Sequence, residues 1–174
     1  KYSDKEIPQI DISPFKSAVF FPALESYQKA LKIREQKNIN EAVYAVKKAV
    51  SSAQAHTFPA GEYRALSCVA FLHLSQNKIE DAVTYFQYAL DIAEALNDSN
   101  FICEALFNLG ISCFLQNSFH TAENFLDRLL QDAENYFEQP KKIPCLFMQG
   151  RVALQLGDYS KAELLFREAE CAAS

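Results

Sequence analysis

The sequence predicts an all-α fold in which about four antiparallel helix pairs stack side by side. A pattern of small and apolar residues recurs every 40 residues, and turn-forming residues divide each repeat into two halves. No stretch alternates apolar and polar residues in the manner of a strand. Of the 174 residues, 49% are hydrophobic and 22% are charged, which is typical of a globular chain with a sizeable core.

Small residues define the repeat. Each copy has one small residue in its first half, a second one twelve residues later and a third one seven residues after that. The aligned sites are Ala30, Ala42 and Ala49; Ala70, Ala82 and Ala89; Gly110, Ala122 and Leu129; and Gly150, Ala162 and Ala169. Only Leu129 departs from the rule. Two antiparallel helices can approach closely where the facing positions carry little side chain, so these sites predict tightly packed helix pairs.

Each repeat is expected to form a helix, a short turn and a second helix. The first helices are predicted over 23–36, 62–76, 101–116 and 143–156, and the second helices over 39–56, 79–97, 119–138 and 159–173. Asn38, Ser118 and Asp158 are favourable N-caps for second helices. Lys78, at the same place in the second repeat, is a poor one. Pro144 suits the first turn of its helix.

The repeats occupy residues 22–174, divided at about 23–61, 62–100, 101–141 and 143–174. Residues 1–21 come before them and contain Pro8, Pro14 and several Ile and Phe residues, which predicts an extended N-terminal arm. Two interpretations of the arm stay open. It packs as an irregular tail on the first helix pair, or it occupies a groove in its own or a neighbouring molecule.

This pattern resembles the tetratricopeptide repeat (TPR) family over about residues 23–173. The small residues carry the resemblance, together with "LFNLGISCFLQNSFHTAENF" from Leu106 and "GDYSKAELLFREA" from Gly157. The resemblance implies a right-handed superhelical solenoid that acts as a non-catalytic protein-interaction scaffold or adaptor. The usual repeat of that family has about 34 residues, so the 40-residue period found here implies longer helices.

The resemblance also implies a concave groove lined by the first helix of each pair. Three positions on each first helix face the ligand in that family, and the matching residues are Tyr27, Leu31, Arg34, Ser67, Phe71, Leu74, Phe107, Ile111, Phe114, Phe147, Arg151 and Leu154. Most are apolar, which favours a partner helix or an extended apolar segment, with Arg34 and Arg151 as polar anchors. Asn108 could bind a peptide backbone. The competing interpretation is that these aromatic residues belong to the core.

Composition and motifs argue against other functions. A net charge of −5 without a Lys/Arg-rich patch argues against a nucleic-acid partner. No apolar run reaches the roughly 18 residues of a membrane-spanning helix. The five cysteines are odd in number and no two are closer than ten residues, which predicts reduced thiols and a cytoplasmic, intracellular location.

No motif predicts an enzyme, a cofactor or a metal. His73 is expected in the core, and His120 with Glu123 is expected to form a solvated pair. Two alternatives to the adaptor remain. One is homo-oligomerisation through the C-terminal helix, which carries Leu164, Leu165 and Phe166, or through the N-terminal arm. The other is a secretion chaperone, although such chaperones look closer to the shorter repeat.

Overall fold

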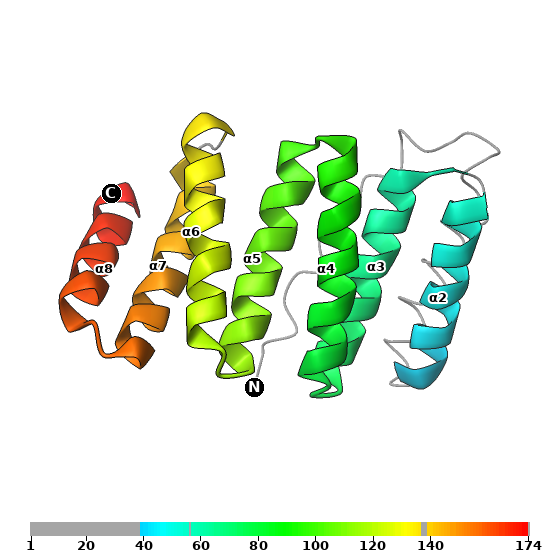
Figure 1. Ribbon diagram of the computed structural model, residues 1–174, viewed down its shortest axis with the longest axis horizontal. Helices are drawn as coiled ribbons and strands as arrows, with labels where there is room; N and C mark the ends of the chain where they lie inside the picture. Colours follow the sequence, from blue (N-terminus) through cyan, green and yellow to red (C-terminus); the bar gives the residue numbers. More distant parts are fainter. Residues whose placement is uncertain (1–38, 56, 137–138, 174) are drawn as a thin grey trace.

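The computed structural model describes residues 39–55, 57–136 and 139–173, and every regular element there is a helix (Figure 1). The helices are α2 (Ile39–Ala55), α3 (Pro59–Ser75), α4 (Ile79–Leu96), α5 (Ser99–Leu115), α6 (Phe119–Tyr136), α7 (Gln139–Leu156) and α8 (Tyr159–Ala173). The predicted all-α solenoid is therefore confirmed. The N-terminal arm, the helix predicted over 23–36 and the candidate site residues Tyr27, Leu31 and Arg34 lie outside the described residues.

The helices stand in one row, and each packs against the next along the chain (Figure 1). The first helices of successive pairs also touch one another, α3 with α5 and α5 with α7. Among the described second helices, no two are in comparable contact. A curved stack brings its elements closest together on the inner side. The first helices α3, α5 and α7 therefore line the inner face, and α2, α4, α6 and α8 form the outer layer.

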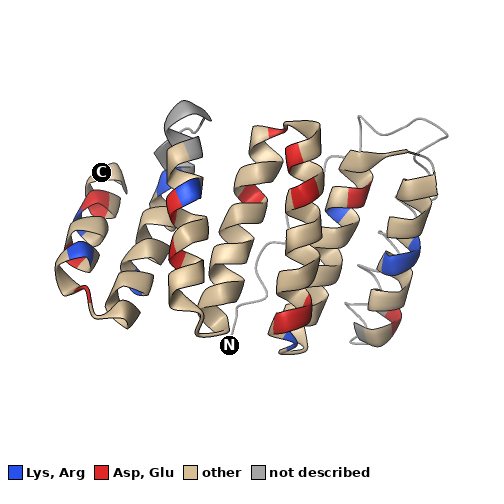
Figure 2. Ribbon diagram, in the orientation of Figure 1, with Lys and Arg blue, Asp and Glu red and all other residues tan. Residues whose placement is uncertain are grey.

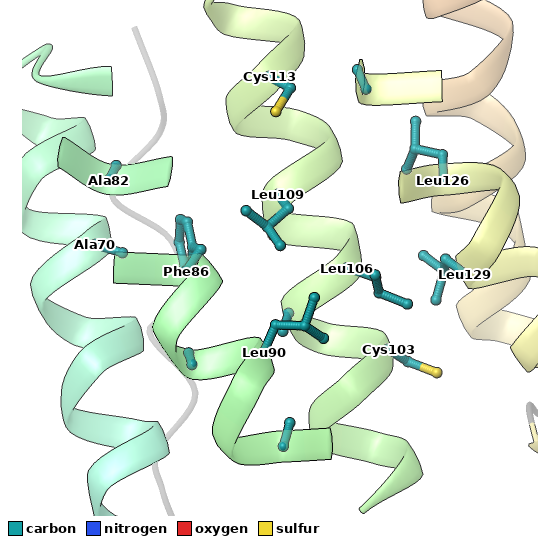
Figure 3. Packing of buried hydrophobic residues seen from close by; sticks show 14 of the residues in the cluster. Ala70, Ala82, Phe86, Leu90, Cys103, Leu106, Leu109, Cys113, Leu126 and Leu129 are labelled. Atoms are coloured by element: carbon teal, nitrogen blue, oxygen red, sulfur yellow. The ribbon is translucent and has the colours of Figure 1, made fainter. Parts of the chain in front are cut away.

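Two of the aligned small residues, Gly110 and Gly150, lie where the two helices of a pair come closest together. A Cβ added to Gly110 would fall 2.8 Å from Cδ2 of Leu126, so the position accepts no side chain without movement. Figure 3 shows the apolar side chains that fill the space around these contacts, with Phe86 and Leu90 of α4 beside α5, and Leu129 of α6 opposite Leu106. These residues are almost completely buried. The 40-residue pattern therefore encodes the packing between helices.

The helices end at residues whose backbone adopts the left-handed conformation. Asn77, Asn97, Asn117 and Gly157 have φ between 52° and 81°, and so does Thr57 at 50°. At Asn77 the backbone N–H bonds to the carbonyl of Leu74, and the next N–H bonds to that of His73. The same pair of bonds recurs at the other four positions, which is the Schellman pattern. Asn and Gly tolerate this conformation best, so the turns recur with them.

The starts of the first helices differ from the sequence prediction by two to four residues. Helix α5 begins at Ser99, because the Asp98 carboxylate accepts hydrogen bonds from the backbone N–H groups of Asn100 and Phe101 at 3.0 and 3.1 Å. Helix α7 begins at Gln139, which places Pro144 inside the helix. The prediction of Pro144 in a first turn was wrong.

The N-terminal caps of two second helices agree with the sequence prediction. The Asp158 carboxylate accepts a hydrogen bond from the backbone N–H of Lys161 at 2.9 Å, as expected for an N-cap. Lys78 makes no side-chain capping bond, which confirms it as the poor member of the set.

Candidate partner-binding groove

The candidate groove is the exposed face of α3, α5 and α7. Its described members are Phe71, Leu74, Phe107, Asn108, Ile111, Phe114, Phe147, Arg151 and Leu154, and none of them is buried. Phe71 is 46% exposed and Phe147 is 53% exposed, so these two rings do not belong to the core. Ser67, by contrast, is only 5% exposed, and the prediction that it faces a ligand was wrong.

Rings from neighbouring second helices support the groove aromatics. Phe71 meets Phe86 edge-on, with ring centroids 5.1 Å apart, and Phe147 lies 5.5 Å from Phe166. Phe114 contacts Phe119 in the same way, at 5.6 Å. Each pair belongs to one helix–turn–helix unit. Because one side of each groove ring is held by a neighbour, the other side is offered to solvent in a restricted set of rotamers.

Four apolar residues of the groove are half-buried. Leu74, Phe107, Ile111 and Phe114 pack against the main core with one side. They therefore belong partly to the core, as the competing interpretation expected, and partly to the surface. These four residues form a half-buried apolar surface, and Phe71 and Phe147 are more exposed than they are.

Arg151 connects two repeats within this face. Its guanidinium lies 4.7 Å from the centre of the Phe114 ring, a cation–π distance. Its Nη1 is 3.9 Å from the sulfur of Met148. The side chain itself is exposed. Phe114 and Met148 thus fix a positive charge at the α5–α7 junction.

Asn108 is the other polar group of the groove. Its side-chain nitrogen is inaccessible to solvent and has no hydrogen-bond partner among the residues that the structure describes. Its backbone carbonyl accepts a bond from the Ser112 hydroxyl at 2.7 Å. A buried amide donor without an acceptor costs about 1–3 kcal/mol, so an acceptor supplied from outside would be favourable.

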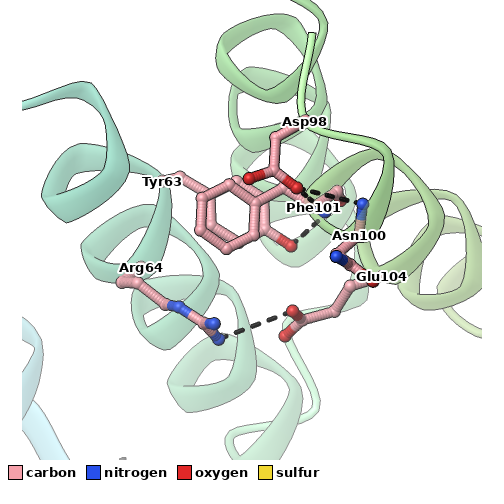
Figure 4. Close-up of polar contacts among 6 residues, drawn as sticks. All are labelled: Tyr63, Arg64, Asp98, Asn100, Phe101 and Glu104. Atoms are coloured by element: carbon pink, nitrogen blue, oxygen red, sulfur yellow. Dashed lines mark hydrogen bonds and ion pairs between the residues drawn. The ribbon is translucent and has the colours of Figure 1, made fainter. Parts of the chain in front are cut away.

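A cluster at one end of the groove holds α3 and α5 together (Figure 4). The rings of Tyr63 and Phe101 stack with centroids 4.2 Å apart, and the Tyr63 hydroxyl donates to the Phe101 carbonyl at 3.2 Å. Arg64 lies 4.9 Å from the Phe101 ring and pairs with Glu104 at 3.5 Å. Burial raises the pKa of the Tyr63 hydroxyl, which therefore remains a donor. This cluster was not predicted from the sequence, although Arg64 and Glu104 lie one 40-residue period apart.

Charge is distributed unevenly between the two layers of helices. Helix α4 carries Glu80, Asp81, Asp91 and Glu94, whereas α5 carries Glu104 as its single charged residue. Figure 2 shows acidic residues gathered on the outer helices α4 and α6, while most of α5 and α7 is uncharged. The inner face is therefore suited to burying apolar surface, and the outer face to water.

The described residues contain no group of three or more side chains that could hold a metal ion. His73 is buried, stacks on Tyr85 at 5.3 Å and lies 3.4 Å from the Asp81 carboxylate, as expected of a core histidine. Burial lowers its pKa, so its neutral form is favoured. His120 lies 3.9 Å from Glu123 at the surface. No helix among those described is both long and apolar enough to cross a membrane.

The cysteines form no disulfide. Cys103, Cys113 and Cys145 are buried, Cys68 is half-buried and Cys171 is exposed. Burial raises the pKa of the Cys113 thiol and raises that of Cys145 to about 12. The buried thiols are therefore packing groups rather than nucleophiles.

Stacked helix–turn–helix pairs with a side-chain-lined inner face define a helical-repeat protein of the kind that binds other proteins. The family model for the tetratricopeptide repeat matches residues 62–135 and 102–170, and the chain belongs to this family.

Known proteins agree with this assignment. A TPR repeat-containing protein of Treponema pallidum (strain Nichols) is 40% identical over 168 residues, which is 97% of this chain and 20% of the relative. Among solved structures, the apo form of RapI has a TM-score of 0.83 at 18% identity, covering 93% of this chain and 45% of RapI. A Rap protein complexed with competence and sporulation factor has a TM-score of 0.75 at 15% identity, covering 93% and 45%. These structural likenesses concern the fold.

Proposed function

We propose that this chain is a non-catalytic adaptor that binds a helix or an extended segment of a partner protein along the inner face of α3, α5 and α7. The observation that carries the proposal is the row of supported aromatic side chains on three successive first helices. Phe71, Phe114 and Phe147 each rest on a ring of their own repeat and keep one side toward solvent. The TPR fold is that of a protein-interaction scaffold in general.

The expected affinity is moderate. Covering a large apolar side chain contributes roughly 1.5–3 kcal/mol, and the groove offers several such side chains. Association itself costs about 4–15 kcal/mol in lost freedom and in ordering of the ligand. Because the groove rings are already held in place, the ligand bears most of the ordering cost. A dissociation constant in the micromolar range, about 1–100 μM, is therefore expected for a single peptide.

Other features are consistent with a protein or peptide partner. The net charge of −5 is unfavourable for a phosphate backbone. A solved Rap protein of similar fold is complexed with competence and sporulation factor, so a solenoid of this shape can hold a bound factor. A cytoplasmic location belongs to the same proposal and rests on the five thiols.

The test begins with selection of 16-residue peptides from a displayed random library. A selected peptide is then added to protein labelled at Ile and Leu methyl groups, and the methyl shifts are followed by NMR. The proposal expects large shifts for Leu74, Ile111 and Leu154 on the inner face. Leu96 and Leu164, which are exposed on second helices, serve as matched controls and should not move. Shifts confined to Leu96 and Leu164 would place the site on the outer face and contradict the proposal.

Self-assembly through α8 is a second candidate with its own observation. Tyr159 is 72% exposed and Phe166 is half-buried, whereas the equivalent residues Phe119 and Leu126 on α6 are half-buried and fully buried. Helix α8 therefore leaves exposed the equivalents of residues that are more deeply buried on α6. A molar mass that rises with concentration, and that Tyr159→Glu returns to the monomer value, would support this candidate.

A further inference from the structure

Arg151 differs from the other described arginines in its surroundings. Arg64 pairs with Glu104 at 3.5 Å, Arg128 with Glu94 at 2.6 Å and Arg167 with Glu163 at 2.7 Å. Arg151 has no such partner among the described residues, where its contacts are the Phe114 ring and the Met148 sulfur. The thioether sulfur is a weak acceptor for one N–H group, and the remaining donors of the guanidinium have no strong acceptor among the described residues.

The two inner helices that meet at Arg151 supply no free carboxylate, and on the outer helices Glu123 pairs with Lys161 and Glu168 with Lys142. Helix α7 contains no Asp or Glu, and the single acidic residue of α5 is Glu104, which already pairs with Arg64. Arg151 is therefore an exposed cation held against the Phe114 ring and the Met148 sulfur, with no carboxylate at salt-bridge distance among the described residues.

A partner that covers the groove must also compensate the positive charge of Arg151. Phe114 is one of the rings that the proposed ligand covers, and Arg151 lies directly over it. Covering the ring removes water from the guanidinium as well, and a buried charge without a partner is strongly unfavourable. A carboxylate is the best replacement for that water, because it accepts two N–H bonds from a guanidinium side by side.

We infer that the groove selects an apolar peptide segment that carries one acidic side chain, Asp or Glu, placed to pair with Arg151. This inference rests on the proposed function and adds the chemistry of the ligand to it. It makes Arg151 a specificity-determining residue, with Phe114 as the residue that positions it. The apolar residues of the ligand supply the apolar surface that is buried on binding. The carboxylate sets the register of the ligand along the groove.

The test compares peptide selections on the wild-type chain and on Arg151→Glu, using the same 16-residue random library. Wild type should enrich Asp or Glu at one fixed place between apolar residues, and Arg151→Glu should enrich Lys or Arg at that place. A synthetic wild-type ligand, amidated at its C-terminus, should lose about tenfold in affinity when its acid is changed to Lys. Binding of that Lys peptide should recover on Arg151→Glu. A merely structural role for Arg151 would not produce this exchange.

Controls separate this inference from the proposed function. Arg167→Glu changes an exposed arginine on α8, outside the groove, and should leave the selection unchanged. Circular dichroism should show unchanged helix content in both variants. Selected peptides that shift the Ile111 methyl yet show no acidic preference would overturn the inference and leave the groove intact. Binding that needs a free C-terminal carboxylate would overturn the inference alone. Failure to select any peptide would overturn both the inference and the proposed peptide-binding function of the groove.

Discussion

Gly150 of α7 lies against the ring of Phe166 in α8, so closely that a Cβ on the glycine would fall 2.5 Å from Cε1 of the ring. Gly110 stands in the same relation to Leu126, one period earlier. A small residue on the first helix and a large one sixteen positions later therefore form one packing unit. This unit explains why the sequence repeats small residues, and it leads to the first prediction.

Gly110→Ala should destabilise the fold. Overpacking a core costs about 1–3 kcal/mol, which exceeds the roughly 1 kcal/mol that alanine gains over glycine inside a helix. Leu126 is fully buried and has little room to move. We expect the free energy of unfolding, measured in urea, to fall by about 1 kcal/mol. In a Leu126→Ala background the same change should become neutral or stabilising, and an equal loss in both backgrounds would contradict the packing unit.

The left-handed backbone conformation of Gly157, whose φ is +81°, predicts that substitutions there lower stability by different amounts. Gly157→Ala should lower stability by about 1 kcal/mol, because a Cβ disfavours this conformation. Gly157→Asn should cost less, since Asn77 and Asn117 adopt it at the equivalent places. Thr57, a β-branched residue at φ +50°, should gain stability on change to Gly. Thermal melting of the three variants tests the order, and equal effects of Ala and Asn at residue 157 would refute it.

His73 should make stability depend on pH. Burial lowers its pKa below the usual histidine value of 6.5, while Asp81 opposes the shift with a smaller effect. Below pH 6.5 the unfolded chain therefore binds a proton that the folded chain resists, and the contribution of neutral His73 is lost as pH falls toward the folded pKa. Above pH 6.5 that contribution is complete. His73→Phe retains a ring against Tyr85 but cannot titrate, so its unfolding free energy should fall less on acidification, and identical profiles would exclude His73 as the cause.

The thiols should react in the order of their exposure. Cys171 is exposed and should be modified first by a thiol reagent such as DTNB, with half-buried Cys68 following more slowly. Cys103, Cys113 and Cys145 are buried and should react only when the chain unfolds. Mass spectrometry of labelled peptides measures the order. Rapid labelling of Cys145 in the folded chain would contradict the burial that raises its pKa to about 12.

Most of the fold could be predicted because its signals are local. Small residues at fixed spacing marked the helix contacts, and Asn77, Asn117 and Gly157 marked the turns within repeats. The first residues of the first helices were harder to predict from the sequence. Asp98 caps α5 from within a segment of turn-forming residues, and the sequence does not show which of them accepts the bonds. Pro144 lies inside α7 for a similar reason, because the helix begins before the apolar pattern does.

The candidate site was partly predictable. The resemblance to the TPR family was enough to expect Phe71 and Phe147 at ligand-facing positions of their helices, and both are exposed. The burial of Ser67 and the contact between Arg151 and Phe114 depend on how one repeat is rotated and shifted against the next. That geometry follows from many side chains together, so no short stretch of sequence reveals it.

The most direct test of the groove compares Phe147→Asp with Tyr88→Asp in binding to a selected peptide. Both side chains are 53% exposed in the native fold, but Phe147 lies on the inner helix α7 and Tyr88 on the outer helix α4. The two variants should therefore lose similar, small amounts of stability. We expect Phe147→Asp to weaken peptide binding by tenfold or more, about 1.4 kcal/mol, and Tyr88→Asp to leave it unchanged. Equal binding by both variants, or loss only with Tyr88→Asp, would contradict a ligand site on the inner face.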